Sequence, residues 1–149
     1  MIIEFDKEYA FLSNFYDASC EFEGIVYPTV EHAFQAAKTL DIEKRKEFAA
    51  ASTPGKAKRM GRSVDLRSDW EEVKTDVMRD CLRSKFAEPG LRKLLLATGS
   101  EELMEGNWWH DNTWGNCLCD ECLNKPGRNM LGMLLMEIRK EIRYEVENR

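Results

Sequence analysis

Apolar residues recur every three or four positions in two long segments of the chain, which is the spacing of one face of an α-helix. In the first segment this face holds Trp70, Val73, Val77 and Cys81. In the second, which begins near Asn129, it holds Leu131, Leu134, Leu135, Ile138 and Ile142. The two patterns predict the longest helices of the protein, each with one buried face.

Helix-capping residues mark the starts of three helices. Thr29 and Thr53 each offer a side-chain oxygen to the amides of a first helical turn, and Pro54 suits the first helical position. Ser68 and Glu71 form a capping box before the first long helix. Shorter helices are therefore expected over residues 30–40, 42–51, 54–61 and 90–98.

Two short stretches near the N-terminus have the composition of β-strands. "MIIEF" at residues 1–5 is a strand candidate, and "CEFEGIVY" at residues 20–27 has a glycine between two runs rich in aromatic and β-branched residues. The second stretch predicts a hairpin. A chain of 149 residues suits one domain. The expected fold is therefore α+β: a mostly helical single domain with a small N-terminal β-sheet.

The segment between Gly99, which closes a short helix, and Asn129 has neither helical nor strand periodicity. It holds three of the four tryptophans and three of the five cysteines. A long irregular stretch inside a compact domain is usually functional or disordered, and the tryptophans argue against disorder. We expect this irregular segment and the helix that follows Thr29 to line the same pocket.

Charge and cysteine content narrow the class of protein. The net charge is −5 and the pI about 5.2, which does not fit a general nucleic-acid coat. No run of 18 apolar residues predicts a membrane span, and the first residues lack a basic region followed by an apolar block. Five cysteines without an export signal favour reduced thiols and a cytoplasmic location.

The helix after Thr29 carries an unusual polar face. Glu31, Gln35 and Lys38 are spaced i, i+4 and i+7, so they share one side of the helix. This face could be solvated, with Glu31 paired to its neighbours. It could also be a site, because the helix dipole keeps a first-turn carboxylate ionised and that carboxylate could hold Lys38.

The irregular segment contains a C-x-C-x-x-C cluster of Cys117, Cys119 and Cys122. Structural zinc takes four ligands, and only three thiols are present; His110 could be the fourth. The alternative is three free thiols in an ordered loop, which the tight C-x-C spacing favours. We therefore expect no cofactor and no metal, with zinc at these four residues as the alternative.

Seven ordered blocks cover nearly the whole chain and resemble the NADAR family, also called YbiA-like proteins. The blocks are "FLSNFY" (11–16), "YPTVEHAFQAAK" (27–38), "MGRSVDLRSDWEEVKTDVM" (60–78), "LRSKF" (82–86), "LLATG" (95–99), "DNTWG" (111–115) and "GRNMLGMLLMEIR" (127–139). The resemblance implies an N-glycosidase, which hydrolyses the bond between ribose C1′ and a base-like nitrogen.

The resemblance also implies two classes of substrate. One is a nucleotide-like small molecule, the ribosylamino-pyrimidine phosphates of riboflavin synthesis. The other is ADP-ribosylated guanine in DNA, from which the enzyme would remove ADP-ribose. No membrane partner is expected, and the oligomeric state stays open. A non-catalytic module that binds ADP-ribose or a related nucleotide is the alternative function.

Four residues are candidates for the chemistry of C1′–N cleavage. Glu31, Glu105 and Asp111 could stabilise positive charge on the sugar, activate water or protonate the leaving nitrogen. Lys38 could instead attack C1′ and form a Schiff base with the ring-opened sugar. That route needs a neutral amine, and a neighbouring Glu31 would oppose deprotonation. The sequence leaves both routes open.

A further set of residues is predicted to bind the substrate. Asn14 could hydrogen-bond ribose or base, although "LSNF" could also be a turn that buries Leu12 and Phe15. Arg62 could bind phosphate or cap a helix end, and Trp114 could stack on a base. The full set of substrate-binding candidates is Asn14, Phe15, Gln35, Arg62, Trp114, Gly115 and Asn129.

Overall fold

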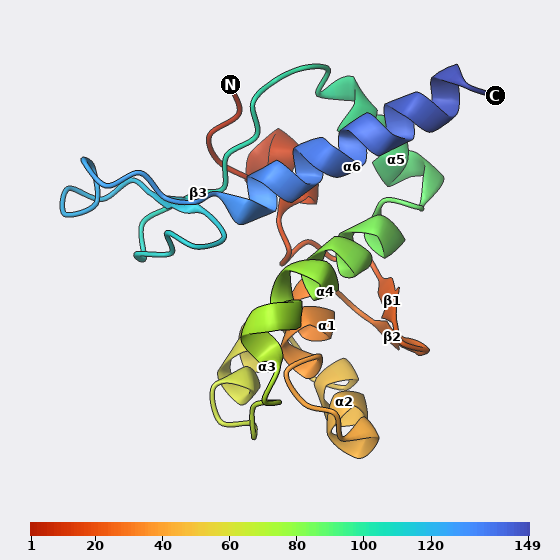
Figure 1. The fold of residues 1–149 in the computed structure, drawn as a ribbon, viewed down its shortest axis with the longest axis vertical. Coiled ribbons are helices and arrows are strands. Elements are labelled where there is room, and N and C mark those ends of the chain that lie inside the picture. The colour runs from red at the N-terminus through yellow and green to blue at the C-terminus, as the bar shows by residue number, and fades with distance from the viewer. The chain divides into compact units, whose positions relative to one another are not determined.

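The computed structural model describes all 149 residues, Met1–Arg149 (Figure 1). Contacts along the chain divide it into two compact units. The first is continuous, Asn14–Glu88, and the second combines Met1–Ser13 with Pro89–Arg149. None of the helices combines the length and the apolarity that crossing a bilayer requires.

The unit Asn14–Glu88 is built around a short central helix, α1. Its elements are β1 (Cys20–Phe22), β2 (Ile25–Tyr27), α1 (Val30–Ala36), α2 (Ile42–Ala49), α3 (Pro54–Gly61) and α4 (Trp70–Lys85). Helix α1 contacts α2, α3, α4 and both strands, and all seven of its residues are buried (Figure 1). The polar side chains of α1 are therefore held inside this unit and not on a solvated face.

The predicted hairpin is confirmed. Strands β1 and β2 pair antiparallel, with Cys20 opposite Tyr27 and Phe22 opposite Ile25. Glu23 and Gly24 form the two-residue turn with φ values of 46° and 84°. Two positive φ angles match the primed turns whose twist suits a hairpin, and glycine adopts them without steric cost.

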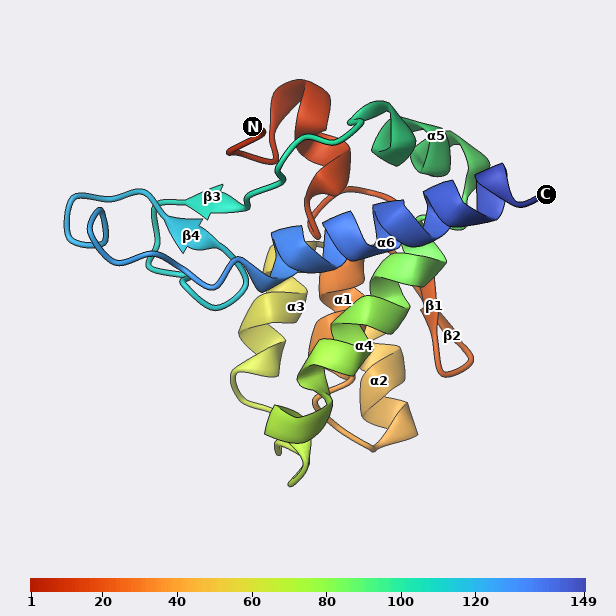
Figure 2. The same ribbon diagram turned by 45° about the horizontal axis from the view of Figure 1, so that its top comes forward.

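The second unit contains the longest helix and the irregular segment. Its elements are the 3₁₀ helix η1 (Lys7–Leu12), α5 (Pro89–Ala97), β3 (Gly106–Asn107), β4 (Asn116–Cys117) and α6 (Met130–Glu147). Helix α5 packs on α6, and β3 lies parallel to β4 (Figure 2). The predicted apolar stripe of α6 is buried along its length, from Leu131 to Ile142. The α+β, mostly helical fold class is confirmed.

Three local expectations were wrong. Helix α1 ends at Ala36 and not near Leu40. The capping box at Ser68 does not form, because α4 begins after Asp69, whose carboxylate binds Arg67. Within residues 1–5 only Ile2 makes a bridge, to Leu103, before the chain turns into η1.

Candidate active site

The start of α1 is fixed by hydrogen bonds that involve His32. Thr29 is the N-cap, and its hydroxyl oxygen accepts from the His32 backbone N–H at 3.2 Å. Both ring nitrogens of His32 are also engaged, Nδ1 with the Thr29 hydroxyl (2.8 Å) and Nε2 with the carbonyl of Ala51 (3.0 Å). A buried imidazole with two partners is a structural group, and it fixes the start of α1.

Glu31 and Gln35 form a buried pair on α1. They are 7% and 5% exposed, and Gln35 Nε2 donates to Glu31 Oε1 at 2.9 Å. Gln35 Oε1 is buried without a donor. A Cβ atom on Gly61 would lie 1.9 Å from this oxygen, so α3 approaches α1 closely at a residue that has no side chain. The packing of Gly61 holds Gln35 against Glu31.

Gly61→Ala is expected to displace Gln35 and weaken its bond to Glu31. Overpacking of this kind costs about 1–3 kcal/mol, which at least offsets the roughly 1 kcal/mol that alanine gains over glycine in a helix, and an overlap as close as 1.9 Å places the cost toward the upper end. We expect a lower free energy of unfolding in urea and a lower kcat/KM. Gly55→Ala is the matched control in the same helix, because a Cβ there meets no atom closer than 3.9 Å. Equal effects of both substitutions on both measurements would contradict the assignment.

Lys38 lies in the turn just after α1. Hydrogen bonds from Arg67, a residue distant in the sequence, fix this turn. The backbone N–H of Lys38 bonds the carbonyl of Gln35 (3.2 Å), while its own carbonyl accepts from the Arg67 N–H at 2.8 Å. The Arg67 guanidinium reaches the Ala37 carbonyl (3.4 Å) and is held by both carboxylate oxygens of Asp69. Arg67 thus satisfies carbonyls left open at the end of α1 and positions Lys38.

The amine of Lys38 is easier to deprotonate than an ordinary lysine. Partial burial is the largest cause that lowers its pKa from 10.5, and the nearby charges of Lys58 and Arg62 lower it further. Glu31 acts in the opposite direction and raises the pKa, as the sequence suggested, but the net shift is downward. A lysine nucleophile needs this downward shift, because it makes the neutral amine easier to form.

Lys58 of α3 and Arg62, the residue that follows this helix, are the cations that act on the Lys38 amine, and Lys58 also faces an exposed ring. The ammonium of Lys58 stands 6.0 Å from the ring centre of Phe15, whose side chain is 46% exposed. Arg62 forms the C-cap of α3 with its backbone N–H, while its side chain is exposed and makes no ion pair. The alternative interpretation of "LSNF", as a turn that buries Leu12 and Phe15, holds for Leu12 but not for Phe15, whose ring is half exposed and faces Lys58.

Asn14 joins the "LSNF" turn to α1. Its carbonyl accepts from the Glu31 backbone N–H at 3.1 Å. Its side-chain amide donates only to the sulfur of Met78 (3.5 Å), and its buried Oδ1 has no donor. A buried acceptor without a partner costs about 1–3 kcal/mol, so Asn14 and Gln35 both stand to gain from a hydroxyl donor.

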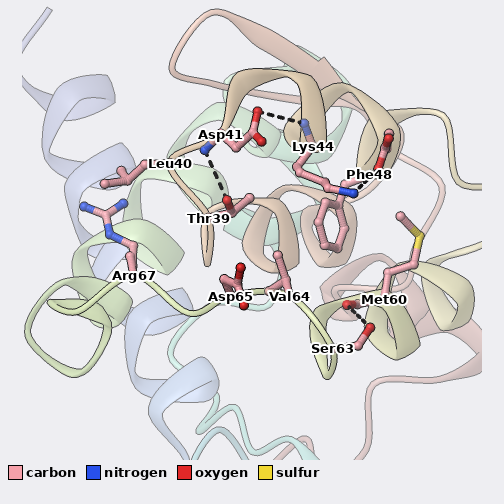
Figure 3. A pocket seen from close by; sticks show the side chains of 11 residues that line it. Thr39, Leu40, Asp41, Lys44, Phe48, Met60, Ser63, Val64, Asp65 and Arg67 are labelled. Carbon is pink, nitrogen blue, oxygen red and sulfur yellow. Dashed lines mark hydrogen bonds and ion pairs between the residues drawn. The ribbon is translucent and has the colours of Figure 1, made fainter.

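A cleft of about 640 Å³ opens beside the turn that follows α1, but none of the predicted site residues lines it (Figure 3). It lies between the start of α2 and the end of α3, with Thr39, Phe48 and Met60 on its walls. Its charged lining mixes both signs and includes the carboxylates of Asp41, Glu47 and Asp65. Because the cleft contains none of the predicted catalytic residues, the chemistry is sought at Glu31 and Lys38.

Sequence reasoning did not single out a second buried lysine, Lys85. It ends α4, is 1% exposed, and its ammonium lies 5.6 Å from the ring centre of Tyr16 and 5.1 Å from that of Phe86. Burial lowers its pKa to about 7, with Cys20 acting in the opposite direction. The one signal in the sequence was that Lys85 lies in the "LRSKF" block, which resembles the NADAR family. Lys85 is the natural comparison for Lys38.

In the second unit, Asp111 is held by a buried asparagine that the sequence also did not single out. Asp111 Oδ1 accepts from the backbone N–H groups of Thr113 (3.1 Å) and Trp114 (2.9 Å). Asn107 is fully buried; its Oδ1 accepts from the Asp111 N–H (3.1 Å) and its Nδ2 donates to the Asp111 carbonyl (2.8 Å). The carboxylate of Asp111 is therefore fixed by local hydrogen bonds.

Glu105 is packed against the residues that begin α6. A Cβ on Gly115 would lie 2.3 Å from the Glu105 carbonyl, so only glycine fits there. Asn129, the residue before α6, donates from Nδ2 to the Leu103 carbonyl (2.9 Å), and its Oδ1 accepts from the Glu105 N–H (3.0 Å). Asn129 makes no side-chain cap to α6. In this structure Gly115 and Asn129 support the chain around Glu105.

Trp114 is half-buried and its backbone is anchored to α6. Its carbonyl accepts from the Leu131 N–H at 2.9 Å, and the carbonyl of Thr113 accepts from the Met130 N–H at 3.1 Å. First-turn amides of a helix lack partners within the helix, so the irregular segment supplies them. The helix thereby orders the stretch that carries both Asp111 and Trp114.

The chain is similar to known proteins along most of its length. The NADAR domain model matches residues 3–143. The chain belongs to the NADAR family. The NMR structure of YbiA from Escherichia coli is 41% identical, with a TM-score of 0.84 over 100% of this chain and 89% of that chain.

Curated relatives give this family an activity. N-glycosidase YbiA of Escherichia coli is 43% identical over 141 residues, which are 93% of this chain and 84% of that protein. An N-glycosidase of Nostoc punctiforme is 39% identical over 92% of this chain and 88% of its own length. A riboflavin biosynthesis protein of Vibrio vulnificus is 34% identical over 92% of this chain and 36% of its own length. The chain is an N-glycosidase of the NADAR family.

Proposed function

We propose that this N-glycosidase cleaves the C1′–N bond of a phosphorylated N-riboside, with Lys38 as the nucleophile. The observation that carries the proposal is the lowered pKa of the Lys38 amine, which results from burial and from Lys58 and Arg62. A neutral lysine attacks carbon, whereas an ammonium cannot. The carboxylate of Glu31, which raises the pKa of Lys38, is the proposed partner in proton exchange with this amine.

The proposed reaction keeps its atoms and protons in balance. The ring-opened N-riboside carries C1′ as a protonated imine, and the neutral Nζ of Lys38 adds to that carbon. The C1′–N bond to the base then breaks, its electron pair stays on the base nitrogen, and that nitrogen takes up the proton that the attacking amine loses. Water hydrolyses the resulting lysine Schiff base and releases the sugar. Glu31 carries the proton between the two nitrogens.

Substrate binding is assigned to the residues around Lys38. The exposed ring of Phe15 offers a surface for the base, and the cations Lys58 and Arg62 suit a phosphate. Asn14 and Gln35 each have a buried acceptor without a donor, which a sugar hydroxyl would satisfy. Of the other substrate-binding candidates, Trp114 is proposed to stack on a base, and direct contacts of Gly115 and Asn129 stay predictions.

Glu105 and Asp111 are proposed as a source of acid or base catalysis. Their fixed positions in the irregular segment would suit protonation of a leaving nitrogen or activation of water. If water attacked C1′ directly, these carboxylates would carry the chemistry and Lys38 would only balance charge. The two routes predict different turnover for the Lys38→Arg variant.

We favour a ribosylamino-pyrimidine phosphate as substrate over ADP-ribosylated guanine in DNA. Riboflavin biosynthesis proteins of Vibrio vulnificus and Zea mays are among the relatives, and the net charge of −5 opposes binding to bulk DNA.

The test is to incubate the purified protein with each substrate and to measure the products. Release of ribose 5-phosphate from the pyrimidine at least about tenfold faster than release of ADP-ribose from DNA would support the choice, since tenfold corresponds to roughly 1.4 kcal/mol of transition-state discrimination. The reverse order would reassign the substrate to DNA. Binding of ADP-ribose with no turnover of either substrate would make the protein a reader instead.

A further inference from the structure

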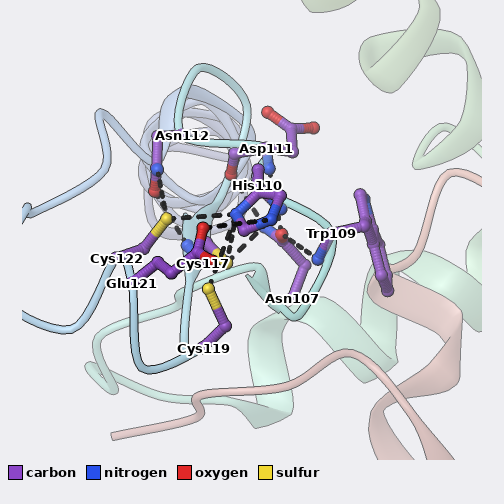
Figure 4. Close-up of polar contacts among 9 residues, drawn as sticks. All are labelled: Asn107, Trp109, His110, Asp111, Asn112, Cys117, Cys119, Glu121 and Cys122. Atoms are coloured by element: carbon purple, nitrogen blue, oxygen red, sulfur yellow. Dashed lines mark hydrogen bonds and ion pairs between the residues drawn. The ribbon is translucent and has the colours of Figure 1, made fainter.

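The fold gathers His110, Cys117, Cys119 and Cys122 into one cluster, although they span thirteen residue positions of irregular chain (Figure 4). One ligand atom from each residue, Nδ1 of His110 and Sγ of each cysteine, lies within 4.8 Å of all the others. All five cysteines of the chain are free thiols. We propose that these four residues bind one zinc ion in a closed tetrahedral site.

The distances within the cluster fit a tetrahedron around zinc. His110 Nδ1 lies 3.3 Å from Cys122 Sγ, 3.5 Å from Cys119 Sγ and 3.9 Å from Cys117 Sγ. Zinc–nitrogen bonds of about 2.0–2.1 Å and zinc–sulfur bonds of about 2.3 Å at tetrahedral angles place nitrogen and sulfur roughly 3.6 Å apart. The three nitrogen–sulfur separations lie around that value, and all four ligand atoms lie within 4.8 Å of one another, so an ion fits between them with modest movement.

The surroundings of the ligands also suit a metal. The backbone N–H of His110 points at Cys117 Sγ (3.3 Å) and the Asn112 amide at Cys122 Sγ (3.5 Å), and such donors stabilise thiolates. Nε2 of His110, the nitrogen that faces away from the sulfurs, lies 3.9 Å from the carboxylate of Glu121. That separation is longer than a hydrogen bond, so the exposed Glu121 carboxylate supplies only a nearby negative charge on the side of the ring away from the sulfurs.

The donor set identifies the metal and its role. Three thiolates and one imidazole are soft ligands in tetrahedral arrangement, which favours zinc over magnesium or calcium. Four protein ligands leave no position for water or substrate, so the ion is structural and not catalytic. The ion would fix the loop from His110 to Cys122. His110 directly precedes Asp111, and Asn112 bonds both Cys122 Sγ and the Cys117 N–H. Zinc therefore holds the segment that carries Asp111.

The proposal is tested on the full chain by zinc content, cobalt spectra and thiol alkylation. The protein is loaded with zinc, passed through a desalting column and analysed; we expect about one zinc per chain. Cobalt in place of zinc should give the visible absorption of tetrahedral thiolate coordination. Cys117, Cys119 and Cys122 should resist iodoacetamide until a chelator is added, as followed by peptide mass spectrometry.

Cys119→Ser is the decisive variant, because Cys119 is the least buried of the three thiols. It should weaken zinc binding by at least roughly a hundredfold, since losing even a group behind the ligands costs up to that much. Asp120→Asn, the exposed neighbour within the same turn, should bind zinc normally. Less than about 0.2 zinc per loaded chain would overturn the proposal. Equal zinc binding by Cys119→Ser and the parent protein, or alkylation at the same rate with and without zinc, would overturn it as well. Zinc content, cobalt spectra and thiol alkylation are all independent of the glycosidase reaction.

Discussion

Replacing Lys38 with arginine is expected to abolish turnover while leaving the fold intact. The guanidinium keeps the positive charge near Glu31, but it stays protonated and cannot attack C1′. Loss of an essential nucleophile lowers kcat by a factor on the order of 10⁴ or more. The measurement is product release by Lys38→Arg, with circular dichroism to check the fold. Lys44→Arg is the matched control, because Lys44 is an exposed lysine paired with Glu47 on α2.

The pH dependence of the parent enzyme gives the same prediction an independent readout. Attack requires the neutral amine, so kcat/KM should rise with pH through the pKa of Lys38. Because burial and the neighbouring cations lower that pKa, the rise should be centred below 10.5. If Lys38 only balances phosphate charge, its protonated form is the active one. In that case kcat/KM should fall, and not rise, as the pH increases through the pKa of Lys38. Near-normal turnover by Lys38→Arg would remove Lys38 from the mechanism.

Neutralising the carboxylates of the irregular segment is expected to have the second largest effect. Asp111→Asn keeps an Oδ1 atom that can still accept from the N–H groups of Thr113 and Trp114, so the local turn should survive. Only the charge and the ability to exchange a proton are lost. We expect kcat to fall about 10²–10⁴-fold in Asp111→Asn, in Glu105→Gln, or in both, the range typical of general acid–base help.

The control for these two variants lies in the same segment. Asp120→Asn removes an exposed carboxylate two residues before Cys122 and should leave kcat unchanged. Thermal unfolding of all three variants separates lost chemistry from lost structure. Unchanged turnover in both Asp111→Asn and Glu105→Gln would refute an acid or base role for this segment.

Local capping signals predicted two helix starts and one helix end correctly, although the capping box at Ser68 did not form. Thr29 and Thr53 cap α1 and α3 as expected, and Gly99 follows α5 with a positive φ of 65°. These signals depend on neighbours within four residues, which the sequence displays directly. The end of α1 could not be found in this way. Arg67, almost thirty residues later, binds the carbonyls of Ala37 and Lys38 and ends the helix early.

The candidate site shows the same limit. The spacing of Glu31 and Gln35 predicted that they meet on one face of α1, and they do. The sequence could not predict that α3 brings Lys58 and Arg62 to Lys38, because no local pattern fixes how two helices pack. Nor could spacing show that His110, in a left-handed conformation with φ of 67°, turns back onto the three cysteines.

The central claim, that Lys38 forms a covalent bond to the sugar, is tested most directly by trapping that bond. Borohydride added during turnover of the ribosylamino-pyrimidine phosphate should reduce the Schiff base, and peptide mass spectrometry should find the sugar adduct on Lys38. Lys85, the other lysine whose pKa burial lowers, to about 7, should carry none. An adduct on Lys85 instead of Lys38, or no adduct while product forms at the full rate, would contradict the account.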